Sequence, residues 1–259
     1  MKTLLFGGAA LVALAAATHV RAADVLLTAP ALVPVYNWSI CYVGGNVGYG
    51  SSLNESITFT GSDEAAFFST NQFPRYIAVK PKGASAGAQI GCNAQSAQWV
   101  FGVESDLQWT DIKATGTVSP VPRAGTQFET TATESRKWFG TVRGRAGLLV
   151  KPQVLLYGTA GLAYGEAALS FNTCAPGSPC ASAASSGTNI GWTAGAGLEW
   201  MFARNWTVKG EYLCVDLGSR AVTGNTGLTA APPRVFTASS DQREHIVRLG
   251  VNYSFEWSR

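Results

Sequence analysis

The chain has 259 residues, of which 14% are charged, and a formal net charge of +3. So small a charge, with no cluster of Lys or Arg, excludes an electrostatic signal for nucleic-acid binding. The mean hydropathy is +0.10, yet beyond the N-terminus no apolar run reaches the ~18 residues that a membrane helix needs. Two classes remain, a soluble all-β domain and a membrane β-barrel.

The N-terminus has the pattern of a secretory signal peptide. A lysine supplies the positive start, an apolar stretch covers residues 4–17, and Val20-Arg21-Ala22 fits a small-x-small cleavage site. The apolar stretch is too short for a membrane anchor and polar residues follow it. We therefore expect residues 1–22 to be removed, residues 23–38 to form a periplasmic linker, and residues 39–259 to form the folded domain.

Eight later segments alternate apolar residues with small or polar ones, which is the period of a β-strand. They are Ile40–Gly50, Ala84–Asn93, Gln98–Trp109, Arg136–Leu149, Gln153–Glu166, Asn189–Met201, Trp206–Leu217 and Arg243–Phe255. Soluble strands average ~5–6 residues, whereas a tilted strand needs ~9–11 residues to cross a bilayer. The segment lengths favour a barrel that spans a membrane.

Aromatic residues gather at the two ends of these segments. If the first strand starts in the periplasm, those near the periplasmic ends are Trp99, Phe101, Trp200, Trp206, Tyr253 and Phe255. Those near the external ends are Tyr49, Trp109, Trp138, Tyr164 and Trp192. Two aromatic girdles around an apolar band are typical of membrane barrels, whereas a soluble core would scatter these rings along the strands.

The connections between the segments alternate between long and short. The long ones are Ser51–Gly83, Thr110–Ser135, Ala167–Thr188 and Gly218–Gln242; the short ones lie at Ala94–Ala97, Val150–Pro152 and Phe202–Asn205. This alternation predicts an all-β, eight-stranded antiparallel up-and-down transmembrane β-barrel. Its four long loops would be extracellular, its short turns periplasmic, and both termini periplasmic. Closure of the barrel satisfies every backbone hydrogen bond, as lipid requires.

The same alternation points four acids and four bases into the barrel. They are Glu104, Asp106, Arg143, Arg145, Glu199, Lys209, Glu211 and Arg248. An eight-stranded barrel is just wide enough for its own side chains, and an unpaired buried charge is costly. We therefore expect these residues to pair as a polar plug, with a narrow ion pathway as the alternative.

Six blocks spread over the chain carry a family resemblance. They are Tyr36–Trp38 with Tyr42–Gly50, Gly87–Gly91, Phe101–Leu107, Thr141–Gly147, Gly210–Gly218 and Val247–Phe255. In this order they resemble the Omp25/Omp31-like small outer-membrane proteins of alphaproteobacteria, within the OmpA/OmpX-type barrel superfamily. The resemblance implies a structural, antigenic surface protein in the outer membrane of a Gram-negative cell. Some relatives are reported to bind haemin.

The last strand also resembles the C-terminal signal that the barrel assembly machinery reads. Gly250, Tyr253 and Phe255 match this signal, although residues 256–259 follow the aromatic residue that often ends such chains. The expected partners are therefore outer-membrane lipid, the assembly machinery during biogenesis, and an extracellular ligand held by the loops. The oligomeric state is left open.

Five cysteines offer up to two disulfides in the oxidising envelope. Cys174 and Cys180 flank a turn rich in Pro and Gly, so we expect them to be bonded to each other. Cys41 and Cys92 share a face near the periplasmic ends of the first two strands. The sequence leaves two alternatives for them, a cross-strand disulfide and two free thiols. Cys214 is then left unpaired.

A catalytic site of the Ser-His-acid type requires a histidine. After signal cleavage only His245 remains; Ser239, Ser240 and Asp241 lie nearby in sequence, but no Ser shares its face on a predicted strand. We therefore expect no enzyme, cofactor or metal site. The leading prediction is a structural barrel; the alternatives are a ligand-binding or narrow porin-like protein, with haemin as one candidate ligand, and a lipid-modifying enzyme.

Overall fold

The computed structural model describes residues 36–52, 55–61, 71–123, 125, 127–177, 180–225 and 235–255. All of them belong to one compact unit. The predicted signal peptide and residues 23–35 of the predicted linker lie outside the described residues. Within the described ranges, no helix has both the length and the apolar character needed to cross a membrane.

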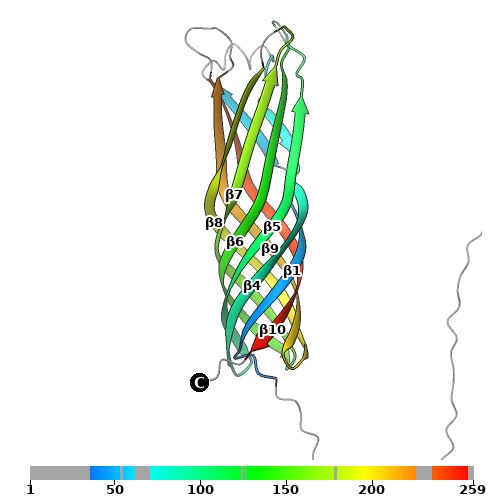
Figure 1. Ribbon diagram of the computed structural model, residues 1–259, viewed down its shortest axis with the longest axis vertical. Coiled ribbons are helices and arrows are strands. Elements are labelled where there is room, and N and C mark those ends of the chain that lie inside the picture. Colours follow the sequence, from blue (N-terminus) through cyan, green and yellow to red (C-terminus); the bar gives the residue numbers. More distant parts are fainter. Residues whose placement is uncertain are drawn as a thin grey trace, which may run out of the picture. The chain divides into compact units, whose positions relative to one another are not determined.

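Ten antiparallel strands form a single sheet (Figure 1). They are β1 (Cys41–Ser51), β2 (Glu55–Gly61), β3 (Tyr76–Val79), β4 (Lys82–Ser96), β5 (Trp99–Val118), β6 (Glu129–Lys151), β7 (Val154–Cys174), β8 (Ala181–Ala203), β9 (Trp206–Asn225) and β10 (Val235–Phe255). β1 pairs with both β4 and β10, so β1 and β4 to β10 close into a ring of eight strands. The predicted eight-stranded antiparallel barrel is confirmed.

The tight connections of the barrel lie where the sequence places them. Two-residue turns at 97–98, 152–153 and 204–205 join β4 to β5, β6 to β7 and β8 to β9. Ala97 has a φ of 53°, the left-handed conformation that two-residue hairpin loops use. The eight predicted strands each fall on one strand of the ring, in the predicted order.

At the opposite end of the barrel the strands are much longer than expected. β5 to β10 contain 20 to 23 residues, about twice the ~9–11 that cross a bilayer. Most of Thr110–Ser135, Ala167–Thr188 and Gly218–Gln242 is therefore strand, and the expectation of four long loops is wrong for these segments. The wall of the barrel instead continues upward as sheet (Figure 1).

A second hairpin takes the place of β1 where that strand ends. The pairing of β1 with β10 stops at Ser51, and β2 pairs with the upper part of β10 over Phe236–Ser239. β3 pairs with β2 and lies beside β5, where a Cβ added to Gly116 would lie 2.5 Å from Ile77 Cγ2. These two strands lie in the segment predicted as the first loop, so that prediction is wrong as well.

The polarity of the wall inverts along its length while the alternation of side chains stays in phase. On β7, Leu156 and Leu162 face outward and are 51% and 62% exposed. Farther up the same strand Leu169 and Phe171 face inward and are buried, whereas Ser170 between them faces outward. The exterior is therefore apolar at the lower end, where it suits lipid, and polar at the upper end, where it suits water.

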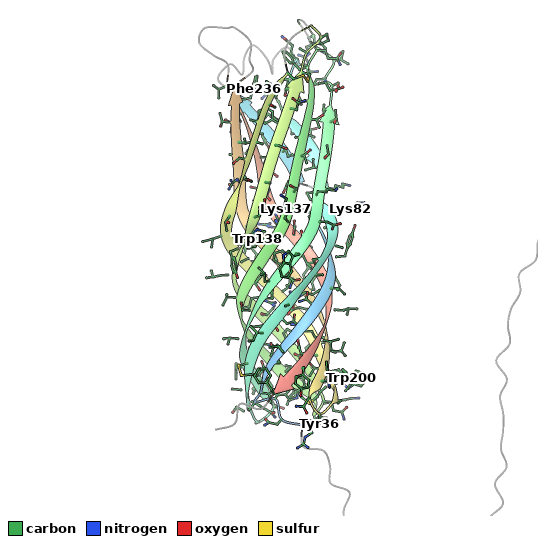
Figure 2. All side chains as sticks on the ribbon, in the orientation of Figure 1. Tyr36, Lys82, Lys137, Trp138, Trp200 and Phe236 are labelled. Atoms are coloured by element: carbon green, nitrogen blue, oxygen red, sulfur yellow. A yellow bond between two sulfur atoms is a disulfide. The ribbon has the colours of Figure 1, made fainter. Side chains whose placement is uncertain are left out.

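Aromatic side chains mark the limits of the apolar exterior. Near the tight turns the outward-facing rings are Trp99, Phe101, Trp200, Trp206 and Tyr253; at the other limit they are Tyr49, Trp109 and Trp192, and all are 44–59% exposed. Figure 2 shows Trp200 and Trp138 at these two levels. We call the wall between the two girdles the lower wall and the wall beyond the second girdle the upper wall. The lower wall carries the exposed apolar band between aromatic girdles that is typical of the membrane-spanning part of a barrel.

Candidate functional site

The interior of the barrel is filled by alternating apolar and polar layers. β10 passes through all but the lowest of them, and its inward residues from the top are Phe236 and Ala238, then Ser240, Gln242 and Glu244, then Ile246, then Arg248 and Asn252. Each is at most 4% exposed. We call the polar layer around Arg248 the lower charge network, and the polar layer around Glu244 the acidic layer.

The lower charge network contains all eight charged residues that the sequence points into the lumen. They are Glu104, Asp106, Arg143, Arg145, Glu199, Lys209, Glu211 and Arg248, each at most 4% exposed. They come from β5, β6, β8, β9 and β10, on the inward side of each strand. The structure brings all eight into one set of hydrogen-bonded ion pairs.

Glu104 lies at the centre of this network. Its carboxylate accepts hydrogen bonds from Lys209 Nζ at 2.7 and 2.8 Å and from the hydroxyl of Tyr42 at 2.6 Å. Arg143 forms a further ion pair with it. A buried carboxylate is tolerated when both oxygens are hydrogen-bonded to charged partners. Glu104 meets this condition, because its partners Lys209, Tyr42 and Arg143 come from three other strands of the wall.

Two arginines bridge the same two carboxylates. Arg248 donates to Glu211 at 2.6 Å and to Asp106 at 3.1 Å. Arg143 donates to Asp106 at 2.8 Å and to Glu211 at 3.1 Å. The planar guanidinium can serve two acceptors at once, so these four residues brace the barrel across its width.

The third part of the network surrounds Arg145. Its guanidinium donates to Glu199 at 2.6 Å and lies 4.0 Å from the centroid of the Tyr157 ring, a distance suited to a cation–π contact. Glu199 also accepts from Thr207 at 2.6 Å and from Asn252 at 2.8 Å. The lower charge network as a whole holds four acids and four bases, so the charges balance within this layer.

Two glycines make room for the tyrosines of this layer. Tyr42 pairs with Gly91 and Tyr157 with Gly197 across neighbouring strands. A Cβ added to Gly91 would lie 2.4 Å from the Tyr42 hydroxyl oxygen, and one on Gly197 would lie 2.5 Å from that of Tyr157. The phenol rings thus occupy the space that a side chain at either glycine would need.

The lower mouth of the barrel is closed by the residues just before β1. Trp38 is 1% exposed and donates from its indole nitrogen to the carbonyl oxygen of Pro152 at 3.1 Å. The hydroxyl of Tyr36 accepts from Gln153 at 2.7 Å. Trp38 packs with Val100, Leu155, Tyr157 and Met201. Tyr36 and Trp38, which the sequence assigns to the linker, therefore contribute to an apolar floor inside the barrel.

The acidic layer lies in the upper wall and was missed by sequence reasoning. It holds three carboxyl groups, those of Glu55, Glu134 and Glu244, but the single guanidinium of Arg136, all at most 8% exposed. Arg136 forms an ion pair with Glu244 and donates to Gln242 at 2.8 Å. Unlike the lower charge network, this layer has more acids than bases among the described residues.

The excess of acid raises the affinity of the layer for protons. Burial, followed by the neighbouring Glu55 carboxylate, raises the pKa of Glu134 to about 7, although Ser240 donates to it at 2.9 Å. Burial also raises the pKa of Glu55, which accepts from the backbone nitrogen of Arg243 at 3.0 Å. Glu134 therefore takes up or releases a proton near neutral pH.

The cysteines form two disulfides. Cys41 is bonded to Cys92, which lies directly across from it on β4. Cys174 is bonded to Cys180 and joins the top of β7 to the start of β8. Cys214 on β9 has a free thiol. The structure thus brings together the loop pair expected from the sequence and the cross-strand pair that the sequence left open.

His245 faces the outside of the wall. Its Nδ1 atom and the hydroxyl oxygen of Tyr212 are 2.5 Å apart. Ser240 points to the inside and binds Glu134, so it lies on the opposite side of the wall from the imidazole. Ser51 of β1 lies directly across from His245, which sequence reasoning did not foresee, and no hydrogen bond joins the two among the described residues. The arrangement is not a nucleophile–base pair.

The three residues that match the assembly signal lie at the lower end of β10. Gly250 faces inward, Tyr253 faces outward and packs edge-on against Trp206 at 5.1 Å between ring centroids, and Phe255 lies directly across from Cys41. Across the described part of the chain, no group of three His, Cys, Asp or Glu side chains is arranged to hold a metal ion.

Comparisons with known proteins agree with this architecture. A family model for the outer membrane protein β-barrel domain matches residues 9–255. A 31 kDa outer-membrane immunogenic protein of Brucella melitensis is 34% identical over 249 residues, which cover 92% of this chain and 95% of that protein. A 25 kDa outer-membrane immunogenic protein of Brucella abortus is 28% identical over 261 residues, 98% and 99% of the two chains.

Among solved structures, the outer membrane protein OprG from Pseudomonas aeruginosa is similar with a TM-score of 0.49 at 10% identity. The alignment covers 86% of this chain and 99% of that one. The two Brucella relatives are named for their immunogenicity and not for a catalysed reaction.

Proposed function

Because the chain belongs to the outer membrane protein β-barrel family, we propose that it is a structural surface protein whose barrel is closed to ions. It is an Omp25/Omp31-like protein of the Gram-negative outer membrane. The observation that carries the proposal is the lower charge network. Its eight charged side chains are at most 4% exposed and are joined by hydrogen bonds and ion pairs across the lumen, which supports a closed barrel.

The layers above and below the network support the same conclusion. The floor around Trp38 fills the lower mouth, and a layer with Phe139, Leu213 and Ile246 separates the network from the acidic layer. An ion crossing the barrel would have to break several buried ion pairs and then pass apolar layers, which is costly in a medium of low dielectric.

The orientation follows from the unequal ends of the barrel. β1 starts and β10 ends at the same level, since Cys41 lies across from Phe255, and the two-residue turns lie at this end too (Figure 1). Outer-membrane barrels have short periplasmic turns and larger external parts. We place this end, and both termini, in the periplasm, and the upper wall outside the cell.

The upper wall then forms a stiff surface structure instead of a set of flexible loops. Its interior has an apolar cluster with Ile57, Phe59, Phe171 and Phe236, and its exterior carries hydroxyl pairs such as Thr115 with Thr133 at 3.0 Å. A packed cylinder of this kind presents its top and sides to external partners. We assign it no catalytic activity, because His245 and Ser240 lie on opposite sides of the wall.

Single-channel recording tests the closed lumen. The chain without its predicted signal peptide is refolded and inserted in a planar lipid bilayer. We expect no steady unitary conductance, because the charge network and the apolar layers close the barrel. Insertion of a general diffusion porin into the same bilayer is the positive control.

Steady unitary steps from the refolded barrel would contradict the proposal and favour the narrow porin-like channel. Titration of the same preparation with haemin addresses the ligand-binding alternative. A saturable shift of the haemin absorbance, absent with a barrel of unrelated sequence, would favour that alternative over a purely structural role.

A further inference from the structure

Three lysines lie close together on the outer face of the upper wall. Lys82 on β4 and Lys113 on β5 are direct cross-strand partners, and both are exposed. Lys137 on β6, the next strand, is exposed and directly precedes Trp138. Figure 2 shows Lys82 and Lys137 at a similar height, above Trp138. We call Lys82, Lys113 and Lys137 the lysine face.

The lysine face has no internal counter-charge that pairs with it. Like charges directly opposite each other on a sheet are destabilising, yet none of the three ammonium groups forms an ion pair within the described residues. The neighbouring strands carry the outward-facing acids Asp111 on β5 and Glu166 on β7, and neither forms an ion pair with these lysines among the described residues. Elsewhere on the outer wall, Arg243 does pair with Asp216 at 2.7 Å.

The height of the lysine face identifies the kind of anion that can reach it. Trp109 and Tyr49, at 59% and 53% exposure, belong to the girdle directly below. Aromatic girdles lie at the level of the lipid headgroups, and lysine side chains extend to bring their ammonium groups to that level. The anion at hand there is the headgroup of a lipid in the same leaflet.

We propose that Lys82, Lys113 and Lys137 form a docking surface for the phosphorylated headgroup of an outer-leaflet glycolipid. Three ammonium groups on adjacent strands, with strands ~4.8 Å apart, can share the oxygens of one or two phosphates. The acyl chains of the same lipid would lie on the apolar lower wall beneath. This docking surface depends on the orientation proposed above, in which the upper wall lies outside the cell. It does not depend on the closed lumen, which the conductance measurement tests separately.

The test is a binding titration of the refolded chain in neutral-detergent micelles. The probe is lipid A with both phosphates, and bound lipid is counted by native mass spectrometry. The test variant is Lys82→Gln with Lys113→Gln. The control variant is Lys151→Gln, which removes an exposed lysine from the opposite end of β6. Heat-modifiable migration on a gel verifies that each variant is folded.

We expect the double variant to bind roughly 30-fold more weakly, because each lysine near an anionic surface contributes about a fivefold factor. Lys151→Gln should bind like the wild type, and Lys82→Arg with Lys113→Arg should retain binding. Lipid A stripped of its phosphates should bind the wild type as weakly as phosphorylated lipid A binds the double variant.

Three results would overturn the proposal. Equal binding of phosphorylated and stripped lipid A would mean that the acyl chains alone are recognised. Unchanged binding by the double variant would place the headgroup elsewhere on the wall. Competition by inorganic phosphate at concentrations similar to those of lipid A would mean that the lysines take free phosphate, not a lipid headgroup.

Discussion

The lower and upper walls of this barrel use the same strands and the same alternation, but with opposite polarity. In the lower wall, outward residues such as Leu162 are apolar and inward residues such as Arg143 are charged. In the upper wall, Phe171 faces inward and Ser170 outward. The backbone is continuous across the change, and the two exteriors suit different surroundings, an apolar one below and an aqueous one above.

The buried polar layers of the two walls differ in charge balance. The lower charge network has four acids and four bases with hydrogen bonds among them, whereas the acidic layer has three acids and one guanidinium. A substitution that changes the charge of a balanced layer should lower the free energy of unfolding of the barrel. A substitution that removes a negative charge from a layer with excess acid should raise that free energy. Three substitutions test this contrast.

The largest effect is expected from Arg143→Ala in the lower charge network. Loss of this guanidinium leaves Asp106 and Glu211 with fewer partners in a buried site. Removing one member of a buried ion-pair network costs about 3–5 kcal/mol. The measurement is the free energy of unfolding from a urea titration of the refolded barrel in micelles, followed by tryptophan fluorescence.

Arg243→Ala is the matched control for that substitution. Arg243 also pairs with an acid, Asp216, but its side chain is 58% exposed, and exposed pairs contribute about 0–1 kcal/mol. Similar losses in the two variants would show that the lower charge network is no more important to stability than a surface pair.

The second effect has the opposite sign. The pKa of Glu134 is raised from 4.5 to about 7, so the folded barrel holds a proton that the unfolded chain releases above pH 4.5. The stability of the wild type therefore falls as pH rises from about 4.5 to about 7 and stays low above that range. One pKa unit corresponds to about 1.4 kcal/mol, so Glu134→Gln should raise the free energy of unfolding at pH 8 by up to about 3 kcal/mol.

The gain from Glu134→Gln should disappear near pH 4, where both states hold the proton. Urea titrations at several pH values, with Glu129→Gln as the control, measure this. Glu129 lies on the same strand but is exposed, so its substitution should leave the pH dependence unchanged. A loss of stability at pH 8 in Glu134→Gln would show that a positive group balances the acidic layer.

The smallest effect is expected from Ser240→Ala. Ser240 donates to Glu134 at 2.9 Å and lowers its pKa. Its removal should cost about 1 kcal/mol at pH 8 and move the stability transition of the barrel above pH 7. Ser239→Ala, which alters the outward-facing neighbour, should do neither. A transition that stays in place would mean that this hydrogen bond does not stabilise the ionised carboxylate.

The lower charge network could be predicted residue by residue, whereas the acidic layer could not. Around Glu104 the outward residues Phe101, Val103 and Leu107 are apolar, with Ser105 as the one exception, so a simple alternation identifies the inward side. Around Glu134 the outward residues are Thr133 and Ser135, which are as polar as residues of a loop. Ala132, Glu134 and Arg136 do alternate with these outward residues. Because the outward residues are not apolar, however, the pattern could not be distinguished from that of a polar loop.

The sequence by itself determined the eight-stranded barrel, its tight turns, its girdles and the residues of the lower charge network. These follow from local alternation, because the outward residues of a strand in lipid are predominantly apolar. Only the tertiary structure decided that the wall continues as sheet above the membrane, that β2 and β3 replace β1 there, and that three acids meet around Arg136. Such features depend on contacts between residues more than 100 positions apart, such as Arg136 with Gln242 and Ser240 with Glu134, and local patterns do not encode them.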